Sequence, residues 1–482
     1  MKYLFGIGFV LFAVLFVVAQ VTLVGEPQDG KVHLLWATDP NPARLVQTRQ
    51  FGTMFPDATV AVDRGDAMRL ITRCATGTGP DLMDIYSIAQ LQTLAETGVL
   101  LDLTPYAKEM GFDPSRTYPA LKNGLKIEGK QYMFPCNVSA DAVIYNKLIF
   151  DDHGLPYPDP NWTWDDFAAV GRQLRETPSQ SGKKHMPVAN WANLAIVGNA
   201  LVGYGARSFT PDGLTCLLDS NEAIAALQLY SDLMHVHHVL PTPAEAVSVA
   251  AQGGWGSGGL TWFSSGKAAM IVIGRWYIVQ VPNWPNIQGH LGAVPLPHAP
   301  GRPSSGAVGC RGPGINAKSL HIPQALEFLQ YLASREYGEV IVQDGDAMPP
   351  NPDVARTGRD LVNEAEPDPA FHQVFIDAIK NARTDDVSPF MDANEVDRWF
   401  QERVEAIENK LQSPPDAMRS LAAEINQKIR HNLERRPDLQ RKFEQVTGRP
   451  YTSDWWKTLQ KPPTEKGTGG RPGLAKVAAS QE

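Results

Sequence analysis

The chain of 482 residues exceeds the roughly 250–300 residues at which single hydrophobic cores stop growing, so at least two core-bearing units are expected. Its composition, 43% hydrophobic and 20% charged, is that of an ordinary soluble globular protein once the N-terminus is set aside. The formal net charge of −8 and the lack of a long basic run argue against a nucleic-acid-binding surface. The eleven tryptophans are more informative, because exposed indoles are costly unless they line a core, an interface or a ligand cleft.

Residues 1–25 have the character of an export segment. Lys2 is followed by an apolar run from Tyr3 to Val18, and residues 17–19 offer a cleavage site for a signal peptidase. The apolar character continues to Val24, so the run also approaches the roughly 20 residues that span a bilayer. The sequence therefore leaves open a cleaved signal peptide and an uncleaved membrane anchor. Both place the folded part in the periplasm or elsewhere outside the cytoplasm.

Beyond residue 30, strand patterns alternate with helix patterns. Residues 31–37, 59–63 and 79–86 are predicted to be strands, and residues 42–55 and 67–74 helices. This alternation predicts an α/β fold with a largely parallel sheet covered by helices. In such sheets the ligand lies beyond the carboxyl ends of the strands. The candidate contacts are therefore the polar residues near the ends of the first and third strands, namely Asp39, Asn41, Asp84 and Tyr86.

The most distinctive stretch covers residues 129–174. It contains Tyr-x-x-Pro at 132–135, Tyr-Asn-Lys at 145–147, Gly-Leu followed by Pro at 154–158, and Thr-Trp-Asp-x-Phe at 163–167. Thr163 is expected to cap the helix that follows, with Asp166 as its reciprocal partner. In this combination the motifs resemble those of extracellular solute-binding protein family 1, the maltose-binding-protein-like sugar-binding proteins of ABC importers.

Other segments are similar to the same family over most of the chain. They are GTGPDLMD at 77–84 with the helix after it, FSSGKAAMIVIGRW at 263–276, GINAKSLHIPQALEFLQYLAS at 314–334, and a helix that begins at 413–416 and runs to about residue 432. The tail after about residue 450 departs from the family. It is rich in Lys, Pro and Gly and is expected to be disordered.

The resemblance implies a two-lobe periplasmic-binding-protein fold of type II, with mixed sheets flanked by helices and a hinge between the lobes. Lobe 1 would comprise residues 30–137 and 307–350. Lobe 2 would comprise residues 138–306 and a helical part at 351–450, and residues 451–482 would form the tail. The chain would cross between lobes near 136–139 and 307–310, and the lobes would close on the ligand by a hinge motion.

Sugar binding requires aromatic faces for the C–H patches of the ring and polar groups for its hydroxyls. Trp276 matches the family's stacking tryptophan, and Trp191 lies about where the second lobe has its other aromatic group. The alternative for each is a place in the core. The polar candidates could instead satisfy a turn or a helix start. These candidates are Asp39, Asn41, Asp84, Tyr86, Asn137, Ser139 and Arg311.

The resemblance implies a non-enzymatic protein that captures a mono- or oligosaccharide and delivers it to the membrane permease and ATPase of an ABC importer. No cofactor, metal or nucleic acid is expected as a partner. A polyamine or a phosphorylated polyol remains an alternative ligand, and a carbohydrate sensor or adhesin an alternative role. An uncleaved N-terminal segment would make the protein membrane-associated.

Catalytic and metal motifs are weak in this sequence. No Walker A loop, HExxH or GxSxG occurs. Ser264 and Lys267 have the SxxK spacing, but they lie inside a motif shared with the solute-binding family. The histidines at 235, 237 and 238 have no carboxylate at an obvious companion spacing, and none of the four cysteines lies in a CxxC or Cys/His spacing. The glycines at 253–259 are expected to form a mobile loop at the mouth of the cleft.

Overall fold

A computed structural model describes residues 29–63, 70–189, 193–247, 258–384 and 386–458. The chain divides into two compact units, residues 1–426 and residues 427–482. Trp191, the candidate export segment, most of the glycine-rich loop and residues 459–482 lie outside the described residues. In the described part of the chain, every helix is too short or too polar to cross a bilayer.

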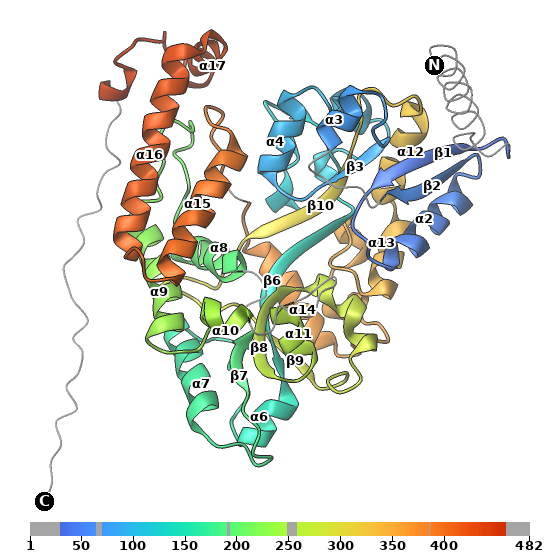
Figure 1. Cartoon of the computed structure of the whole chain (residues 1–482). Helices are drawn as coiled ribbons and strands as arrows, with labels where there is room; N and C mark the ends of the chain where they lie inside the picture. Colours follow the sequence, from blue (N-terminus) through green and yellow to red (C-terminus); the bar gives the residue numbers. More distant parts are fainter. Residues whose placement is uncertain (1–28, 64–69, 190–192, 248–257, 385, 459–482) are drawn as a thin grey trace, which may run out of the picture. The chain divides into compact units, whose positions relative to one another are not determined.

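An eight-stranded sheet forms the framework of the first unit, in the order β2-β1-β3-β10-β6-β8-β7 with β9 also paired to β6 (Figure 1). β1 pairs in parallel with β2 and β3, and β7 pairs in parallel with β8, as the alternation predicts. The sheet is nevertheless mixed, because β10 returns antiparallel to both β3 and β6. The strands are β1 (Val32–Ala37), β2 (Ala58–Asp63), β3 (Leu82–Ile85), β6 (Asn137–Asn146), β7 (Met186–Ala189), β8 (Ala268–Gly274), β9 (Leu291–Val294) and β10 (Val308–Ile315). A small hairpin joins β4 (Lys126–Ile127) to β5 (Lys130–Gln131).

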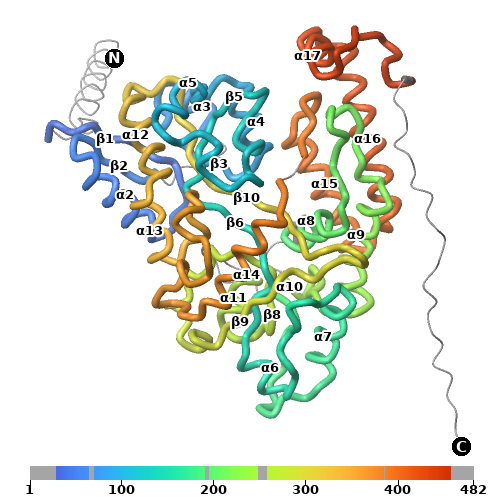
Figure 2. Tube along the Cα trace, turned by 180° about the vertical axis from the view of Figure 1, so that it is seen from behind, coloured from blue at the N-terminus to red at the C-terminus, as the bar shows by residue number. Residues whose placement is uncertain are grey.

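Two groups of helices cover the two ends of this sheet (Figures 1 and 2). Beside β1 to β3 lie α2 (Ala43–Met54), α3 (Leu70–Ala75), α4 (Ile88–Glu96), α5 (Thr104–Ala107), α12 (Ile322–Leu332) and α13 (Arg335–Asp344). Beside β6 to β9 lie α6 (Lys147–His153), α7 (Trp164–Glu176), α8 (Asn193–Tyr204), α9 (Asn221–His235), α10 (Pro243–Val247), α11 (Gly259–Ser264) and α14 (Pro369–Lys380), and α15 (Ala393–Glu408) contacts both α9 and α4. The predicted capping box is present, because Thr163 Oγ1 accepts from the Asp166 amide and Asp166 Oδ2 accepts from the Thr163 amide.

Two long strands carry the chain between the lobes. Residues 137–140 of β6 pair with residues 308–311 of β10. Beyond this crossing the strands separate, because β6 pairs with β8 from Asp141 onward whereas β10 pairs with β3 from Gly312 onward. A Cβ at Gly312 would lie 2.1 Å from the Phe134 carbonyl oxygen, so this close approach of the two crossing segments requires glycine.

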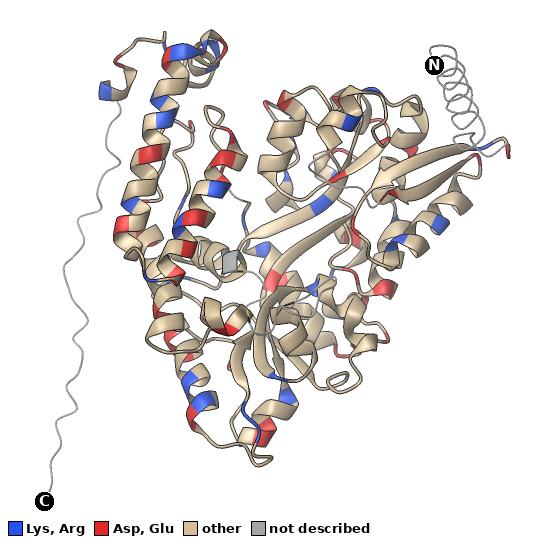
Figure 3. Cartoon of the chain, in the orientation of Figure 1, with Lys and Arg blue, Asp and Glu red and all other residues tan. Residues whose placement is uncertain are grey.

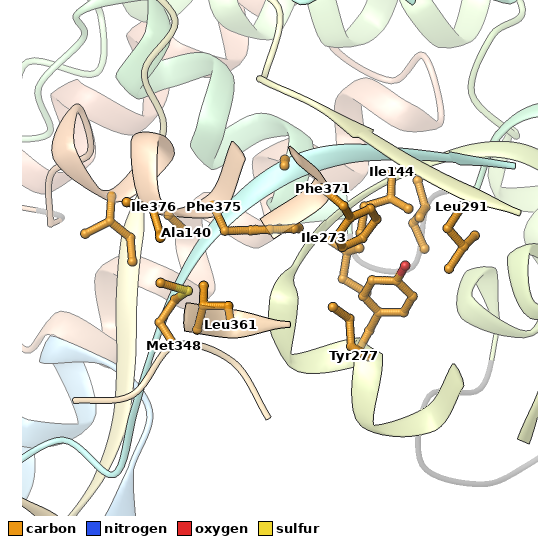
Figure 4. Close-up of a cluster of buried hydrophobic side chains, with 14 of the residues drawn as sticks. Ala140, Ile144, Ile273, Tyr277, Leu291, Met348, Leu361, Phe371, Phe375 and Ile376 are labelled. Carbon is orange, nitrogen blue, oxygen red and sulfur yellow. The ribbon is translucent and has the colours of Figure 1, made fainter. Parts of the chain in front are cut away.

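Each lobe has its own hydrophobic core. In the first lobe Trp36 and Phe51 pack against Phe328 of α12, with ring centroids 5.1 and 5.3 Å apart. In the second lobe the buried strands β6 and β8 pack against Phe371 and Phe375 of α14 (Figure 4). A third cluster, which includes Leu70, Met83 and Leu91, lies beside β3 and α4, so hydrophobic cores lie on both sides of the paired strands, as a hinge requires.

The second unit is helical. It begins within α16 (Pro414–Arg435) and continues through α17 (Pro437–Thr447) and a short 3-10 helix, η7 (Trp455–Thr458). Within this unit Trp455 is buried against Phe443, with ring centroids 5.5 Å apart, and the Arg430 guanidinium lies 4.4 Å from the Trp456 ring centroid. The part of the expected tail at 451–458 therefore packs against α17.

Candidate ligand cleft

A cavity of about 320 Å³ lies where β6 crosses β10. Seven of the nine candidate site residues line it. Of the other two, Asp84 lies beneath the lining and Trp191 lies outside the described residues. The lining residues are Asp39, Asn41, Tyr86, Asn137, Ser139, Trp276, Gly309, Cys310, Arg311 and Asp346.

The residues after β1 reach the cavity from the start of α2. Asn41 Oδ1 accepts from the Ala43 amide at 3.0 Å, so this side chain also makes the hydrogen bond that was expected at a helix start. Asp39 Oδ1 accepts from Arg44 Nε at 3.0 Å. Although burial alone would raise it, the pKa of Asp39 is lowered, because the guanidinium groups of Arg311 and Arg44 favour the ionised carboxylate.

Arg311 is the centre of a buried ionic cluster at the floor of the cavity. Its Nη1 donates to Asp84 Oδ2 at 2.5 Å and to Thr38 Oγ1 at 2.7 Å. Asp39 Oδ2 lies 3.7 Å from Arg311 Nε, and Asp346 Oδ2 lies 4.0 Å from Arg311 Nη2. Charged residues are interspersed along the helices, whereas the strands of the sheet carry few of them (Figure 3). The cluster of opposite charges where β6 pairs with β10 therefore differs from the rest of the sheet, which carries few charged residues.

Two further residues complete the cluster, and the sequence pattern does not single out either. Arg44 Nη1 donates to Asp346 Oδ2 at 2.8 Å, and Asn137 Nδ2 donates to the other oxygen of Asp346 at 3.2 Å. Asp346 follows Gly345, which ends α13 in the left-handed conformation, so in the sequence it resembles an ordinary helix terminus. Arg44 occupies an unremarkable helical position, 302 residues from its partner.

Asp84 is buried behind the cavity lining and holds Arg311 in position through hydrogen bonds. Its Oδ1 accepts from the buried Trp36 indole at 2.8 Å, and its Oδ2 accepts from Thr38 and Arg311. The strand position that favoured Asp84 as a ligand contact thus places it under Arg311, where it holds the guanidinium in position.

Two polar atoms at the cavity are buried and, within the described residues, have no hydrogen-bond partner. They are Arg311 Nη2 and Ser139 Oγ. Buried polar groups are normally paired, and an unpaired one costs roughly 1–3 kcal/mol. A donor and a hydroxyl left unpaired in one cavity indicate a site prepared for a polar ligand.

Aromatic side chains face the cavity from both lobes. Trp276 is half-buried at the start of η4 (Arg275–Asn283), directly after β8, and Tyr86 is 50% exposed after β3. A Cβ at Gly274 would lie 2.0 Å from Ser139 Oγ and 2.8 Å from Trp276 Cδ1, so glycine at 274 allows these two side chains to approach each other. Burial raises the pKa of the neighbouring Cys310 thiol to about 12, which keeps the thiol protonated.

The motifs considered for catalysis or metal binding have local partners instead. Ser264 Oγ donates to the Thr261 carbonyl of its own helix at 3.2 Å. His237 Nδ1 lies 2.9 Å from Arg172 Nη1, a cation that is a poor neighbour for a metal ion. No group of three or more potential His, Cys, Asp or Glu ligands occurs within the described ranges.

Two lobes joined by crossing strands, with a polar and aromatic cavity at the crossing, define a binding protein that holds a small ligand between its lobes. Residues 44–339 match the family model of the bacterial extracellular solute-binding proteins. The chain belongs to this family, as the sequence motifs predicted.

Characterised relatives match over most of the chain. The arabinooligosaccharide-binding protein of Halalkalibacterium halodurans is 26% identical over 324 residues, which cover 65% of this chain and 69% of that protein. The diacetylchitobiose-binding protein of Streptomyces coelicolor is 26% identical over 282 residues, 57% of this chain and 61% of that protein.

Solved structures show the same fold. An ABC substrate-binding protein from Listeria monocytogenes in complex with cycloalternan superposes with a TM-score of 0.69 at 21% identity, over 83% of this chain and 99% of that chain. Maltose-bound MalE3 of T. maritima superposes with a TM-score of 0.66 at 20% identity, over 82% of this chain and 98% of that chain. The predicted two-lobe type II fold is confirmed.

Proposed function

We propose that the protein captures a neutral carbohydrate in the cleft between its lobes and delivers it to the permease of an ABC importer. The observation that carries this proposal is that one cavity holds the Trp276 indole together with two polar atoms, Arg311 Nη2 and Ser139 Oγ, that lack a hydrogen-bond partner among the described residues. An indole face packs against sugar C–H groups, while a guanidinium donor and a hydroxyl satisfy ring and hydroxyl oxygens. The relatives named for arabinooligosaccharides and diacetylchitobiose support the same ligand class.

The charges of the lining favour a neutral ligand over a phosphorylated polyol. Asp39 and Asp346 line the cavity beside Arg311, which is the one Lys or Arg among the lining residues; Arg311 is already paired with Asp84, and Asp39 and Asp346 also pair with Arg44 behind the lining. A phosphate group would approach two carboxylates without gaining a free cation, whereas phosphate sites ordinarily offer several cationic donors. The mature protein would act outside the cytoplasm, with the permease reading the closed, occupied form.

Isothermal titration calorimetry against a defined panel tests this proposal. The panel comprises arabinotriose, maltotriose, diacetylchitobiose and mannitol, with glucose 6-phosphate and spermidine representing the alternative ligand classes. At least one neutral sugar is expected to bind more tightly than either alternative. Tighter binding of spermidine or of the sugar phosphate would overturn the carbohydrate assignment.

The purified protein is expected to leave the bound sugar intact. Ser264, which has the SxxK spacing with Lys267, donates to the Thr261 carbonyl within α11, and it is not among the residues that line the cavity. Reducing-end assays on the same oligosaccharides should therefore remain flat over hours. Steady product release that disappears in Ser264→Ala would show that the protein is a hydrolase.

Ligand is expected to close the lobes and stabilise the protein. Because the lobes meet through the paired strands β6 and β10, a sugar that contacts Trp276 and Arg311 together favours the closed form. Small-angle scattering should show a smaller radius of gyration with ligand. At a ligand concentration of 100 Kd the free energy of unfolding should rise by about 2.7 kcal/mol. An unchanged scattering curve at saturation would contradict the hinge mechanism.

A further inference from the structure

Asp141 follows the cavity-lining Ser139 by two residues along β6; it is not itself among the lining residues and was not expected as a site residue. Successive side chains of a strand point to opposite faces, so Asp141 shares the face of β6 that carries Asn137 and Ser139. Both of those residues line the cavity. In the register of the sheet Asp141 stands opposite Gly274, where a side chain would clash with Ser139 and Trp276.

Asp141 is held by one amide. Asn199 Nδ2 in α8 donates to Asp141 Oδ2 at 2.8 Å. The orientation of Asn199 is fixed, since the same Nδ2 also donates to the Ala195 carbonyl at 2.7 Å and Oδ1 accepts from the Ala307 amide at 2.9 Å. Among the residues that the structure describes, no cation pairs with Asp141 and no donor reaches its second oxygen, Oδ1.

A carboxylate in this position is costly without a counter-ion. Burial raises the pKa of Asp141 to about 6, and the hydrogen bond from Asn199 only partly offsets this effect. An amide side chain could accept the same hydrogen bond from Asn199 without the cost of partly burying a charge. Perturbed acids of this kind occur preferentially at functional sites.

We propose that Asp141 is a specificity-determining residue, whose Oδ1 accepts a hydrogen bond from a hydroxyl of the sugar packed against Trp276, and that Asn199 is its positioning residue. This inference rests on the proposed function and assigns one side of the ligand to lobe 2. A hydroxyl can donate to the ionised carboxylate, and hydrogen bonds to charged groups are roughly twice as strong as neutral ones. The preferred ligand therefore carries a free hydroxyl at this position.

The ionisation of Asp141 controls this hydrogen bond, because a protonated carboxyl is a weaker acceptor. The other charged groups around the site are already engaged by partners of their own. Arg275 at the end of β8 donates to the Ala347 and Leu361 carbonyls, Arg383 beside Ala307 donates to the Ala206 carbonyl, and Asp39, Arg311 and Asp346 form the ionic cluster. Affinity should therefore be full above pH 7 and fall as the pH drops through about 6.

The test compares Asp141→Asn with the wild type by calorimetry, using the panel sugar that binds the wild type most tightly. Asn keeps the shape and can still accept from Asn199, but it lacks the charge. We expect binding to weaken at least ten-fold at pH 7.5 and its pH dependence between 5 and 7.5 to disappear. Asp232→Asn is the matched control, because Asp232 also accepts from a single amide, Gln228 Nε2, but lies on α9, which contributes no residue to the cavity lining, whereas β6 contributes Asn137 and Ser139.

A second measurement covers the case in which Asp141→Asn does not fold. The wild-type Kd is followed from pH 7.5 to 5, with Asp344→Asn as control, since burial also raises the pKa of Asp344 to about 6. The loss of sugar affinity between pH 7.5 and 5 should be the same in Asp344→Asn as in the wild type. A pH-independent wild-type Kd, or equal affinity and pH dependence in Asp141→Asn, would refute the role of Asp141 while leaving the proposed function intact. Failure of every panel sugar to bind the wild type would refute the proposed function itself.

Discussion

Replacing Arg311 with Ala should lower the free energy of unfolding by about 3–5 kcal/mol, because removal of one partner from a buried ionic cluster leaves the others uncompensated. The side chain is only 6% exposed and contacts Asp84, Asp39 and Asp346. In the variant, Asp84 would remain buried beneath the cavity without its cation. Urea denaturation of the ligand-free protein measures the loss.

Arg398→Ala is the matched control for this experiment. Arg398 also forms an ion pair, with Glu402 at 3.1 Å, but both side chains are exposed on α15. Exposed pairs contribute little, so this variant should stay within about 0.5 kcal/mol of the wild type. If Arg311→Ala were as stable as Arg398→Ala, Arg311 would not be the central residue of the cluster.

Replacing Trp276 with Ala should weaken sugar binding ten-fold or more. The indole supplies buried apolar area and a stacking face worth about 0.5–1.5 kcal/mol beyond that area, and each ~1.4 kcal/mol is a factor of ten in Kd. Since Trp276 is half-buried, its loss should cost less than the ~3–5 kcal/mol of stability that removal of a core tryptophan costs.

Trp162→Ala separates these two effects. Trp162 is 2% exposed and donates its indole N–H to the Pro295 carbonyl at 2.8 Å, away from the lining of the cavity. It should lose stability without a change in the affinity of the folded fraction. Trp276 would instead be a core residue if its Ala variant behaved like Trp162→Ala, strongly destabilised with unchanged affinity.

The parts of the fold that depend on local chemistry could be predicted from the sequence. The Thr163 capping box, the strand at 32–37 and the helix at 43–54 follow from side-chain patterns within a few residues. The mixed character of the sheet could not be predicted from the alternation of elements. It arises because β10 returns to the first lobe as a strand antiparallel to β3, rather than through a helical crossover.

Some residues of the candidate site could likewise be predicted from the sequence, and others could not. Strand ends placed Asp39, Tyr86 and Trp276 at the cavity, since topology alone brings those positions together. The Arg44–Asp346 pair could not be found in this way, because it joins residues 302 positions apart that look like ordinary helix residues. Asp141 was missed for another reason, because a single acid within a strand gives no sign that its neighbours among the described residues will supply one amide and no counter-ion.

A crystal structure with the tightest-binding panel sugar tests the central claim most directly, because it locates the ligand. One ring should lie against the Trp276 indole, with a sugar oxygen within hydrogen-bond distance of Arg311 Nη2. A sugar bound elsewhere on the protein, with the cavity at the β6–β10 crossing left empty, would contradict the assignment of this cleft as the ligand site.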